Sequence, residues 1–143
     1  APFFVVNCDA VWLDGPSPAL RRLRDIWDSG SMDALLLMQR MTAVSSAAGR
    51  GDYFLDPLGR ASRRTGHAVS PYLFAGIQIL HPRLFDGAPG GAFSLNHLYD
   101  RAEAAGRLWG MVHDGAWYHV GTPEQRQQAE ADIAPRLFSV PKR

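Results

Sequence analysis

The feature that most constrains this chain is an apolar run near its beginning that ends at a carboxylate. Residues 3–9 read Phe-Phe-Val-Val-Asn-Cys-Asp. Four apolar residues without alternation predict a strand covered on both faces, as in the interior of a parallel sheet. Ligands of open α/β sheets bind beyond the carboxyl ends of such strands. We therefore expect an α/β fold in which Asp9 projects into a ligand-binding crevice and can hold a divalent cation.

The next segments extend this strand to a strand–helix–strand unit. Ser17 followed by Pro18 is typical of a helix start, and Gly30 is typical of a helix end. Ala34–Met38 is a second solid apolar run and predicts another buried parallel strand. Strand, helix and strand in this order predict a βαβ unit with a right-handed crossover.

Turn signals divide the middle of the chain into a hairpin, a strand and a helix. Asp-Pro-Leu-Gly at 56–59 predicts a hairpin that follows Tyr53–Leu55. Leu73–Leu80 predicts a longer strand. Ser94 is a suitable cap for a helix that Gly106 ends.

The last part of the chain predicts a second hairpin and a final helix. An Asp-Gly pair at 114–115 is a strong hairpin signal between two apolar stretches, 108–112 and 116–120. Thr-Pro-Glu-Gln at 122–125 forms a capping box. We expect the helix that it opens to end before Pro135.

The composition is that of an ordinary soluble globular protein and predicts one domain, 1–143. A net charge of +1 gives no electrostatic argument for nucleic-acid binding, and the neighbouring Arg21, Arg22 and Arg24 are predicted to form a solvated helix face. A single cysteine, Cys8, excludes an internal disulfide and fits a reducing cytoplasm. No apolar stretch approaches the length of a membrane span, so we expect no membrane association.

Several motifs in order resemble the sugar-1-phosphate nucleotidyltransferases, in particular those that act on N-acetylmuramate or mannose 1-phosphate. They are Val-Val-Asn-Cys-Asp at 5–9, Gly-Asp-Tyr at 51–53, Phe-Ala-Gly-Ile at 74–77 and Trp-Tyr-His-Val-Gly-Thr-Pro at 117–123. The resemblance implies a Rossmann-like nucleotidyltransferase fold with a mixed, mainly parallel sheet. It covers nearly the whole chain but only the later part of the family's catalytic domain.

The family joins a nucleoside triphosphate to a sugar 1-phosphate and releases pyrophosphate. Both substrates are polyanions, so a cation must neutralise charge and align the reacting groups. The resemblance implies Mg²⁺, which prefers oxygen ligands. Asp9 matches the family's metal-binding aspartate, and Asn7 and Cys8 match the border of the nucleotide site.

Two positions depart from the family pattern. Cys8 stands where the family has a glycine, and His119 stands where many members have the second metal-binding aspartate. A neutral imidazole supplies no negative charge and suits softer metals than magnesium. We expect His119 either to line the site, with or without touching the metal, or to hydrogen-bond within a turn.

Two glycines match positions next to the sugar in related enzymes. Gly51 lies before the first hairpin and Gly76 within the long strand. Glycine allows close approach because it has no Cβ. The alternative interpretation is a loop turn for Gly51 and a strand bend for Gly76.

The family's most specific motif, a Gly-x-x-Gly-Thr-Arg loop that holds the triphosphate, has no match in this sequence. We therefore expect a fold that lacks the N-terminal nucleotide-binding portion and a fragment that is inactive alone. Apolar surface at the edge of an incomplete sheet can drive homo-oligomer formation. The alternative function is a catalytically silent domain that binds or senses a sugar nucleotide. The nucleotide base and the hexose are not specified by the sequence.

Overall fold

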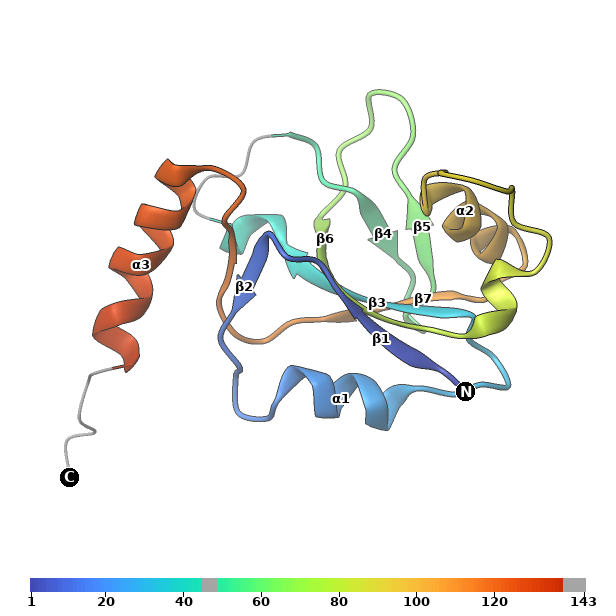
Figure 1. Ribbon diagram of the computed structural model, residues 1–143, viewed down its shortest axis with the longest axis horizontal. Coiled ribbons are helices and arrows are strands. Elements are labelled where there is room, and N and C mark those ends of the chain that lie inside the picture. Colours follow the sequence, from blue (N-terminus) through green and yellow to red (C-terminus); the bar gives the residue numbers. More distant parts are fainter. Residues whose placement is uncertain (45–48, 138–143) are drawn as a thin grey trace.

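The computed structural model describes residues 1–44 and 49–137. Within these residues, six strands form one mixed sheet in the order β5-β4-β6-β3-β7, and β1 also pairs with β6. Helix α1 lies below this sheet and α2 lies at its other side, whereas α3 stands apart (Figure 1). The strands of the sheet are β1 (Phe3–Val6), β3 (Ala34–Arg40), β4 (Tyr53–Leu55), β5 (Ala61–Arg63), β6 (Tyr72–Leu80) and β7 (Leu108–Val112).

The predicted strand directions are wrong, because the sheet is mostly antiparallel rather than mainly parallel. β6 runs antiparallel to β1, β3 and β4, and β4 runs antiparallel to β5. The pair β3–β7 is parallel. A solid apolar run such as that of β3 shows that both faces are covered, but it does not determine the direction of the neighbouring strands.

The predicted interior position of β1 is also wrong. Among the described strands, β1 pairs with β6 alone. Phe3, Phe4 and Val6 are 40%, 42% and 46% exposed, and Val5 packs against a buried cluster. The apolar run therefore identified a strand correctly but not its neighbours.

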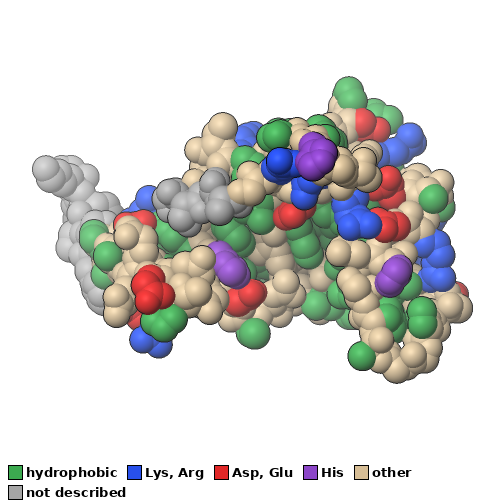
Figure 2. All heavy atoms as spheres, turned by 90° about the horizontal axis from the view of Figure 1, so that it is seen from above, with side chains coloured by type: hydrophobic (Ala, Val, Ile, Leu, Met, Phe, Trp, Pro, Cys, Tyr) green, Lys and Arg blue, Asp and Glu red, His purple; other side chains and the backbone are tan. Residues whose placement is uncertain are grey.

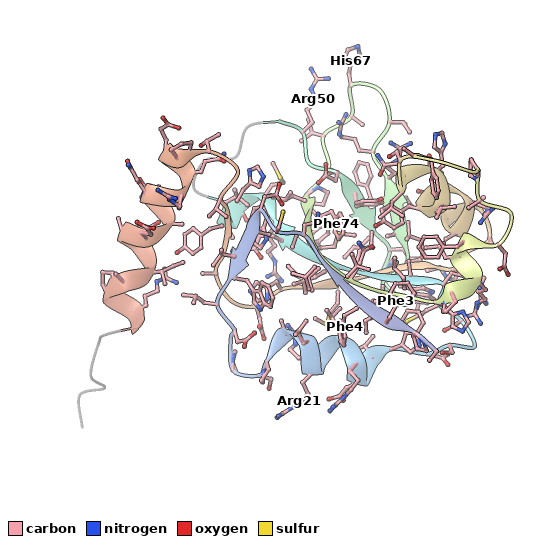
Figure 3. The ribbon with its side chains drawn as sticks, viewed as in Figure 1. Phe3, Phe4, Arg21, Arg50, His67 and Phe74 are labelled. Carbon is pink, nitrogen blue, oxygen red and sulfur yellow. The ribbon has the colours of Figure 1, made fainter. Side chains whose placement is uncertain are left out.

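The predicted strand–helix–strand order is confirmed, with β6 inserted between the two strands. β1 and β3 both run antiparallel to β6 and so run in the same direction. The connection between them contains the short strand β2 (Ala10–Trp12) and helix α1 (Ala19–Ile26), which buries Leu23 completely. Its first turn is capped by the Asp14 carboxylate, which accepts a hydrogen bond from Ala19 N at 2.8 Å, rather than by Ser17. Arg21 points away from the molecule (Figure 3).

Two apolar clusters cover the two faces of the sheet, and β3 contributes to both. Leu35 and Leu37 pack with the α1 residues, while Leu36 and Met38 pack on the opposite face. That opposite face also receives α2 (Asn96–Ala104), the short helix η2 (Pro82–Phe85) and part of the confirmed β4–β5 hairpin. The alternation places apolar side chains on both sides of one strand, which explains its unbroken apolar sequence.

The predicted hairpin at 114–115 is wrong. β7 pairs with β3, whereas β8 (Trp117–His119) pairs with β2 (Ala10–Trp12) in a separate two-stranded sheet. Between β7 and β8, the ring of His113 is buried and bridges two main-chain carbonyls. Its Nε2 lies 3.0 Å from Leu13 O and 3.1 Å from Ala116 O. An Asp-Gly pair therefore marks a turn here, but not a turn between paired strands.

The final helix α3 (Pro123–Leu137) begins as predicted and continues past its expected end. Thr122 Oγ1 accepts from Gln125 N, and Gln125 Oε1 accepts from Thr122 N, each at 3.1 Å. This reciprocal pair confirms the capping box. Pro135 lies inside the helix instead of ending it. The short helix η1 (Met41–Ala43) follows β3.

A cluster of charges joins β3, β6 and β7 at one end of the sheet. Asp33 precedes β3, and its Oδ1 accepts from Arg83 Nε at 2.5 Å and from Arg107 Nε at 2.9 Å. The same two arginines also donate to main-chain carbonyls of the loop before β3. We call Asp33, Arg83 and Arg107 the arginine clamp.

None of the helices within residues 1–44 and 49–137 is long and apolar enough to span a membrane.

Candidate active site

A cavity of about 500 Å³ lies along one side of β6. On that side β6 pairs with β4 at Tyr72 and with β1 from Ile77 onward. The stretch between these two partners, residues 73–76, lines the cavity. Seen from above, hydrophobic side chains floor this region, and histidine, acidic and arginine side chains surround it (Figure 2). The cavity therefore occupies a gap between two neighbouring strands.

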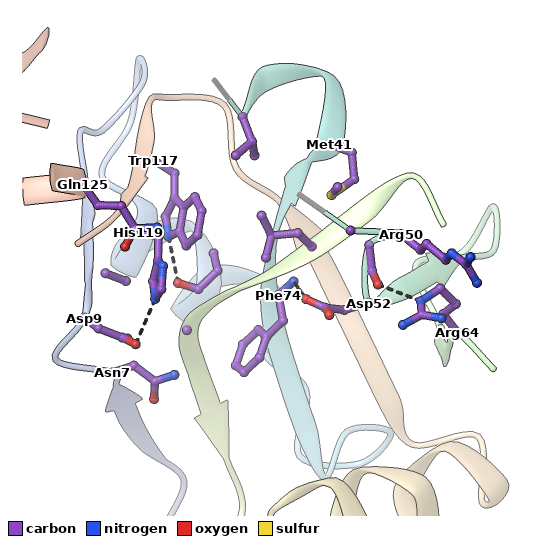
Figure 4. Close-up of a pocket in the computed structure, with 17 residues that line it drawn as sticks. Asn7, Asp9, Met41, Arg50, Asp52, Arg64, Phe74, Trp117, His119 and Gln125 are labelled. Atoms are coloured by element: carbon purple, nitrogen blue, oxygen red, sulfur yellow. Dashed lines mark hydrogen bonds and ion pairs between the residues drawn. The ribbon is translucent and has the colours of Figure 1, made fainter. Parts of the chain in front are cut away.

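Asp9 and His119 meet on one wall of the cavity (Figure 4). The β2–β8 ladder places Ala10 opposite His119, and Val120 N donates to Asp9 O at 2.7 Å. His119 Nε2 lies 3.0 Å from Asp9 Oδ2, and the two side chains remain 46% and 51% exposed. Backbone pairing therefore fixes the positions of Asp9 and His119, and both side chains remain accessible to a ligand.

Trp117 packs against His119 of this pair. Its ring is stacked beside that of His119, with centroids 6.3 Å apart and an interplanar angle of 12°. Its indole Nε1 donates to Ala75 O at 2.8 Å and ties β8 to β6. Trp117 is 8% exposed, which confirms its predicted place in the core.

Gly76 brings β6 close to the segment that follows β1. Asn7 N donates to Gly76 O at 2.8 Å. Gly76 has a φ of +83°, and a Cβ built there would lie 3.1 to 3.3 Å from side-chain atoms of Asn7. Both the backbone conformation and the close approach favour glycine, and the Asn7 side chain is left facing the cavity.

Gly51 fixes the opposite wall. It has a φ of +75°, and a Cβ there would lie 2.9 Å from Tyr72 O and closer still to Ser70. The adjacent Asp52 accepts from Phe74 N through Oδ2 at 2.8 Å, so its carboxylate takes the place of a strand partner for β6. The tight contacts of Gly51 are thus with the protein's own atoms, namely the Ser70 hydroxyl and two main-chain carbonyls.

The structure brings together five of the six predicted site residues. Cys8 is exposed and is not among the residues that line the cavity. The residues that line the cavity are Asn7, Asp9, Gly51, Gly76 and His119.

Sequence reasoning missed four polar residues of the cavity wall. Asp52 lay inside the Gly-Asp-Tyr motif, which could have identified it. Arg64 follows β5 in the predicted hairpin; it lines the cavity and donates to Gly51 O at 2.9 Å. Arg50 and Gln125 also line the cavity, and only the fold brings them there.

The charges of the cavity suit a polyanionic ligand and a cation together. Arg50 and Arg64 lie on the Gly51 side, across from Asp9 and His119 (Figure 4). Residues 1–44 and 49–137 contain no cluster of three or more His, Cys, Asp or Glu side chains that could enclose a metal ion. The Asp9 carboxylate fits a Mg²⁺ ion, because Mg²⁺ is commonly bound by one or two carboxylates together with waters and substrate phosphates, whereas the His119 imidazole fits it less well. The two side chains do not fit an all-protein metal cage.

The chain is similar in sequence to a curated enzyme. It is 32% identical over 133 residues to the N-acetylmuramate alpha-1-phosphate uridylyltransferase of Caulobacter vibrioides, and the match covers 93% of this chain and 55% of the relative. The chain belongs to the sugar-1-phosphate nucleotidyltransferase family. It spans about half the length of this relative. No protein-family model matches it.

Solved structures show the same fold. An apo UDP-glucose pyrophosphorylase superimposes with a TM-score of 0.69 at 16% identity, over 96% of this chain and 55% of that chain. A putative glucose-1-phosphate thymidylyltransferase from Bacillus anthracis, in complex with a sucrose, gives a TM-score of 0.63 at 18% identity, over 99% and 57%. The nucleotidyltransferase-like α/β fold predicted from the motifs is therefore confirmed, with the mostly antiparallel sheet described above.

Proposed function

We propose that residues 1–143 are one domain, part of a catalytic domain that joins a nucleoside triphosphate to a hexose 1-phosphate and releases pyrophosphate. The single observation that carries this proposal is the convergence of Asn7, Asp9, Gly51, Gly76 and His119 on one cavity. The Caulobacter relative, by its name a uridylyltransferase for N-acetylmuramate 1-phosphate, supports the same reaction class. Because the chain spans about half of this relative, the activity is proposed for the whole protein and not for these residues alone.

In this proposal the Asp9 wall holds the cation and the opposite wall holds the sugar. Asp9 supplies a carboxylate oxygen to Mg²⁺, and His119 stands beside it as a second donor or as a hydrogen-bond partner that orients the carboxylate. When bound, Mg²⁺ neutralises phosphate charge and aligns the phosphates. Asn7 borders the nucleotide; the nucleotide role of Cys8 stays a prediction, since its side chain lies outside the cavity lining.

The remaining residues act by binding and positioning. Gly51 and Gly76 line two sides of the cavity, where their main chain would border the sugar. Arg50 attracts the anionic groups of the substrates, and Arg64 adds positive charge to the same wall of the cavity. Such positioning and charge stabilisation supply most of the catalysis in phosphoryl-group transfer.

Pyrophosphate release by the full-length protein tests the proposal. With Mg²⁺, a nucleoside triphosphate and a hexose 1-phosphate, Asp9→Asn should lower kcat/KM at least about a hundredfold, the scale of a lost charge-stabilising group. Asp86→Asn changes an exposed aspartate outside the cavity and is the matched control. Full activity of Asp9→Asn would remove Asp9 from this role, and no turnover by the wild type would argue against the reaction.

The second candidate function is a catalytically silent sugar-nucleotide-binding domain. The pairing of Asp9 with His119 favours it, because the imidazole already occupies one carboxylate oxygen. Calorimetric titration of the full-length protein with Mg²⁺ and a nucleotide sugar separates the two candidates. Binding without turnover would support the silent domain.

A further inference from the structure

A second, smaller cavity of about 200 Å³ adjoins the first. Three residues line both cavities: Asp52, Arg64 and Phe74. The small cavity is completed by three residues that the large one does not use, Tyr53, Arg63 and Asn96. We call it the Tyr53 pocket. Its position, next to the Gly51 wall, places it beside the proposed sugar site.

Tyr53 carries a polar group that the protein leaves unsatisfied. Its side chain is 2% exposed, and its hydroxyl has no hydrogen-bond partner among the described residues. Burial, and then the neighbouring Tyr99, raise the pKa of the Tyr53 hydroxyl, so it stays protonated and able to donate. A buried hydroxyl without a partner is costly, and such groups in native proteins call for an explanation. Tyr99, by contrast, donates its hydroxyl to Gln78 Oε1.

The other polar groups of the pocket are mainly donors. Arg64 is held by Gly51 O and Gly66 O through Nε and Nη1, each at 2.9 Å, and Nη2 has no partner within residues 1–44 and 49–137. The Arg63 guanidinium forms a bidentate ion pair with Asp100, in which Nε donates to Oδ1 at 2.7 Å and Nη2 donates to Oδ2 at 2.6 Å. Its positive charge is therefore largely balanced. The Asp52 carboxylate has Oδ2 engaged by Phe74 N. The Tyr53 hydroxyl and Arg64 Nη2 therefore remain to donate to an acceptor, and such a pair suits oxygen atoms.

We propose that the Tyr53 pocket is a specificity pocket that receives an oxygen-bearing side group of the sugar phosphate, with Tyr53 and Arg64 as its donors. This inference rests on the proposed function. The side group is an amide carbonyl or a carboxylate, both of which present acceptor oxygens. An unsubstituted hexose leaves the Tyr53 hydroxyl unpaired, and a site built to hydrogen-bond a group discriminates against ligands that lack it.

Three sugar phosphates of increasing substitution test the pocket in the full-length protein. Glucose 1-phosphate has neither side group, N-acetylglucosamine 1-phosphate adds an amide, and N-acetylmuramate 1-phosphate adds a carboxylate as well. The wild type should favour one or both of the substituted sugars in kcat/KM. Tyr53→Phe should lower the ratio of substituted to unsubstituted kcat/KM about tenfold, the scale of one hydrogen bond to an amide or a charged group. If Tyr53→Phe lowers kcat/KM for N-acetylglucosamine 1-phosphate relative to glucose 1-phosphate, the group in the pocket is the amide. If it lowers kcat/KM for N-acetylmuramate 1-phosphate alone, the group is the carboxylate.

Two controls separate a ligand role from a structural one. Tyr118→Phe removes a hydroxyl from a tyrosine that lines neither cavity, and it should leave the ratio unchanged. Without ligand, Tyr53→Phe should unfold at the same midpoint as the wild type or a higher one, because it removes an unpaired hydroxyl, whereas Tyr99→Phe should unfold at a lower midpoint.

The outcomes distinguish this inference from the proposed function. No turnover of any of the three sugar phosphates overturns the proposed function. Turnover with equal kcat/KM for all three, or a ratio that Tyr53→Phe does not change, overturns the specificity pocket alone. A lower unfolding midpoint of ligand-free Tyr53→Phe would assign the hydroxyl a structural role and would also overturn the inference.

Discussion

Asp33 and Asp9 lie at opposite ends of the sheet, and their surroundings differ in almost every respect. Asp33 precedes β3, has a side chain 16% exposed, and is bound by two arginines. Asp9 follows β1, has a side chain 51% exposed, and is bound by one histidine. The first carboxylate is saturated by the protein, whereas the second retains capacity for a ligand. The same residue type therefore serves structure at one end and, in our proposal, chemistry at the other.

The arginine clamp and the cavity also differ in whether the side chains or the backbone are held in place. At the arginine clamp the side chains themselves are fixed by each other and by main-chain carbonyls. At the cavity the backbone is fixed, through the positive φ of Gly51 and Gly76 and the bond from Phe74 N to Asp52, while the side chains of Asp9 and His119 stay accessible. A binding site needs a rigid frame with free donors and acceptors, and the cavity end meets both conditions.

Substituting Gly51 would break the cavity frame and should have the largest effect. In Gly51→Ala, the Cβ would meet Ser70 and Tyr72 O in a left-handed backbone conformation, so the free energy of unfolding should fall by about 3 kcal/mol. Gly66→Ala is the matched control, since Gly66 has a φ of +58° and nothing within 4 Å of a Cβ; it should cost about 1 kcal/mol. Chemical denaturation measures both, and equal losses would show that close packing at Gly51 is unimportant.

Removing the charge of Asp33 would break the arginine clamp. Asp33→Asn leaves Arg83 and Arg107 without their shared carboxylate, and the free energy of unfolding should fall by about 2 kcal/mol. Asp25→Asn alters a surface pair with Arg24 and should change it by less than about 0.5 kcal/mol. If the two variants were equally stable in urea titrations, the clamp would contribute no more than a surface ion pair.

Acid should remove the contribution of the clamp in a defined range of pH. Burial alone would raise the pKa of Asp33, but hydrogen bonds from Arg83 and Arg107 outweigh it and hold this pKa below its ordinary value of about 3.9. A lowered folded-state pKa stabilises the protein above the unfolded-state value and is lost as pH falls through the folded-state value. The difference in unfolding free energy between wild type and Asp33→Asn should thus stay constant from about pH 7 to 5 and shrink below about pH 4. A constant difference down to about pH 2 would contradict the assigned shift.

The smallest expected effect is at the capping box on the rim of the cavity. Thr122→Ala removes the acceptor for Gln125 N and should lower the free energy of unfolding by about 1 kcal/mol. Thr65→Ala, at an exposed loop position, is the control and should stay within about 0.5 kcal/mol. An equally small loss in Thr122→Ala would show that α3 does not depend on its cap.

The sequence predicted individual elements better than their partners. The solid apolar run of β3 correctly predicted a strand with both faces covered, since α1 covers one face and α2 the other. The run does not indicate that the neighbouring strand β6 is antiparallel to β3. The Asp-Gly pair at 114–115 is local information, whereas the pairing of β8 with β2 spans more than a hundred residues. Pairing over such distances depends on the whole fold, and local patterns do not contain it.

The site shows the same division between local and long-range information. Asp9, Gly51, Gly76 and His119 were found because each lies in a recognisable motif. Arg64 was missed because a hairpin arginine looks the same in sequence whether it faces solvent or bonds to Gly51 O. Tyr53 could not be singled out, since an unsatisfied hydroxyl is a property of packing.

The β2–β8 ladder ties residues near the beginning of the chain to residues near its end, and it carries Asp9 and His119 into contact. A ribosome would therefore have to release more than a hundred residues after Asp9 before the two side chains could meet. Nascent chains halted before β8 could already assemble much of the sheet, but they would lack one whole wall of the cavity. In our proposal, metal affinity should accordingly appear only after β8 has been synthesised.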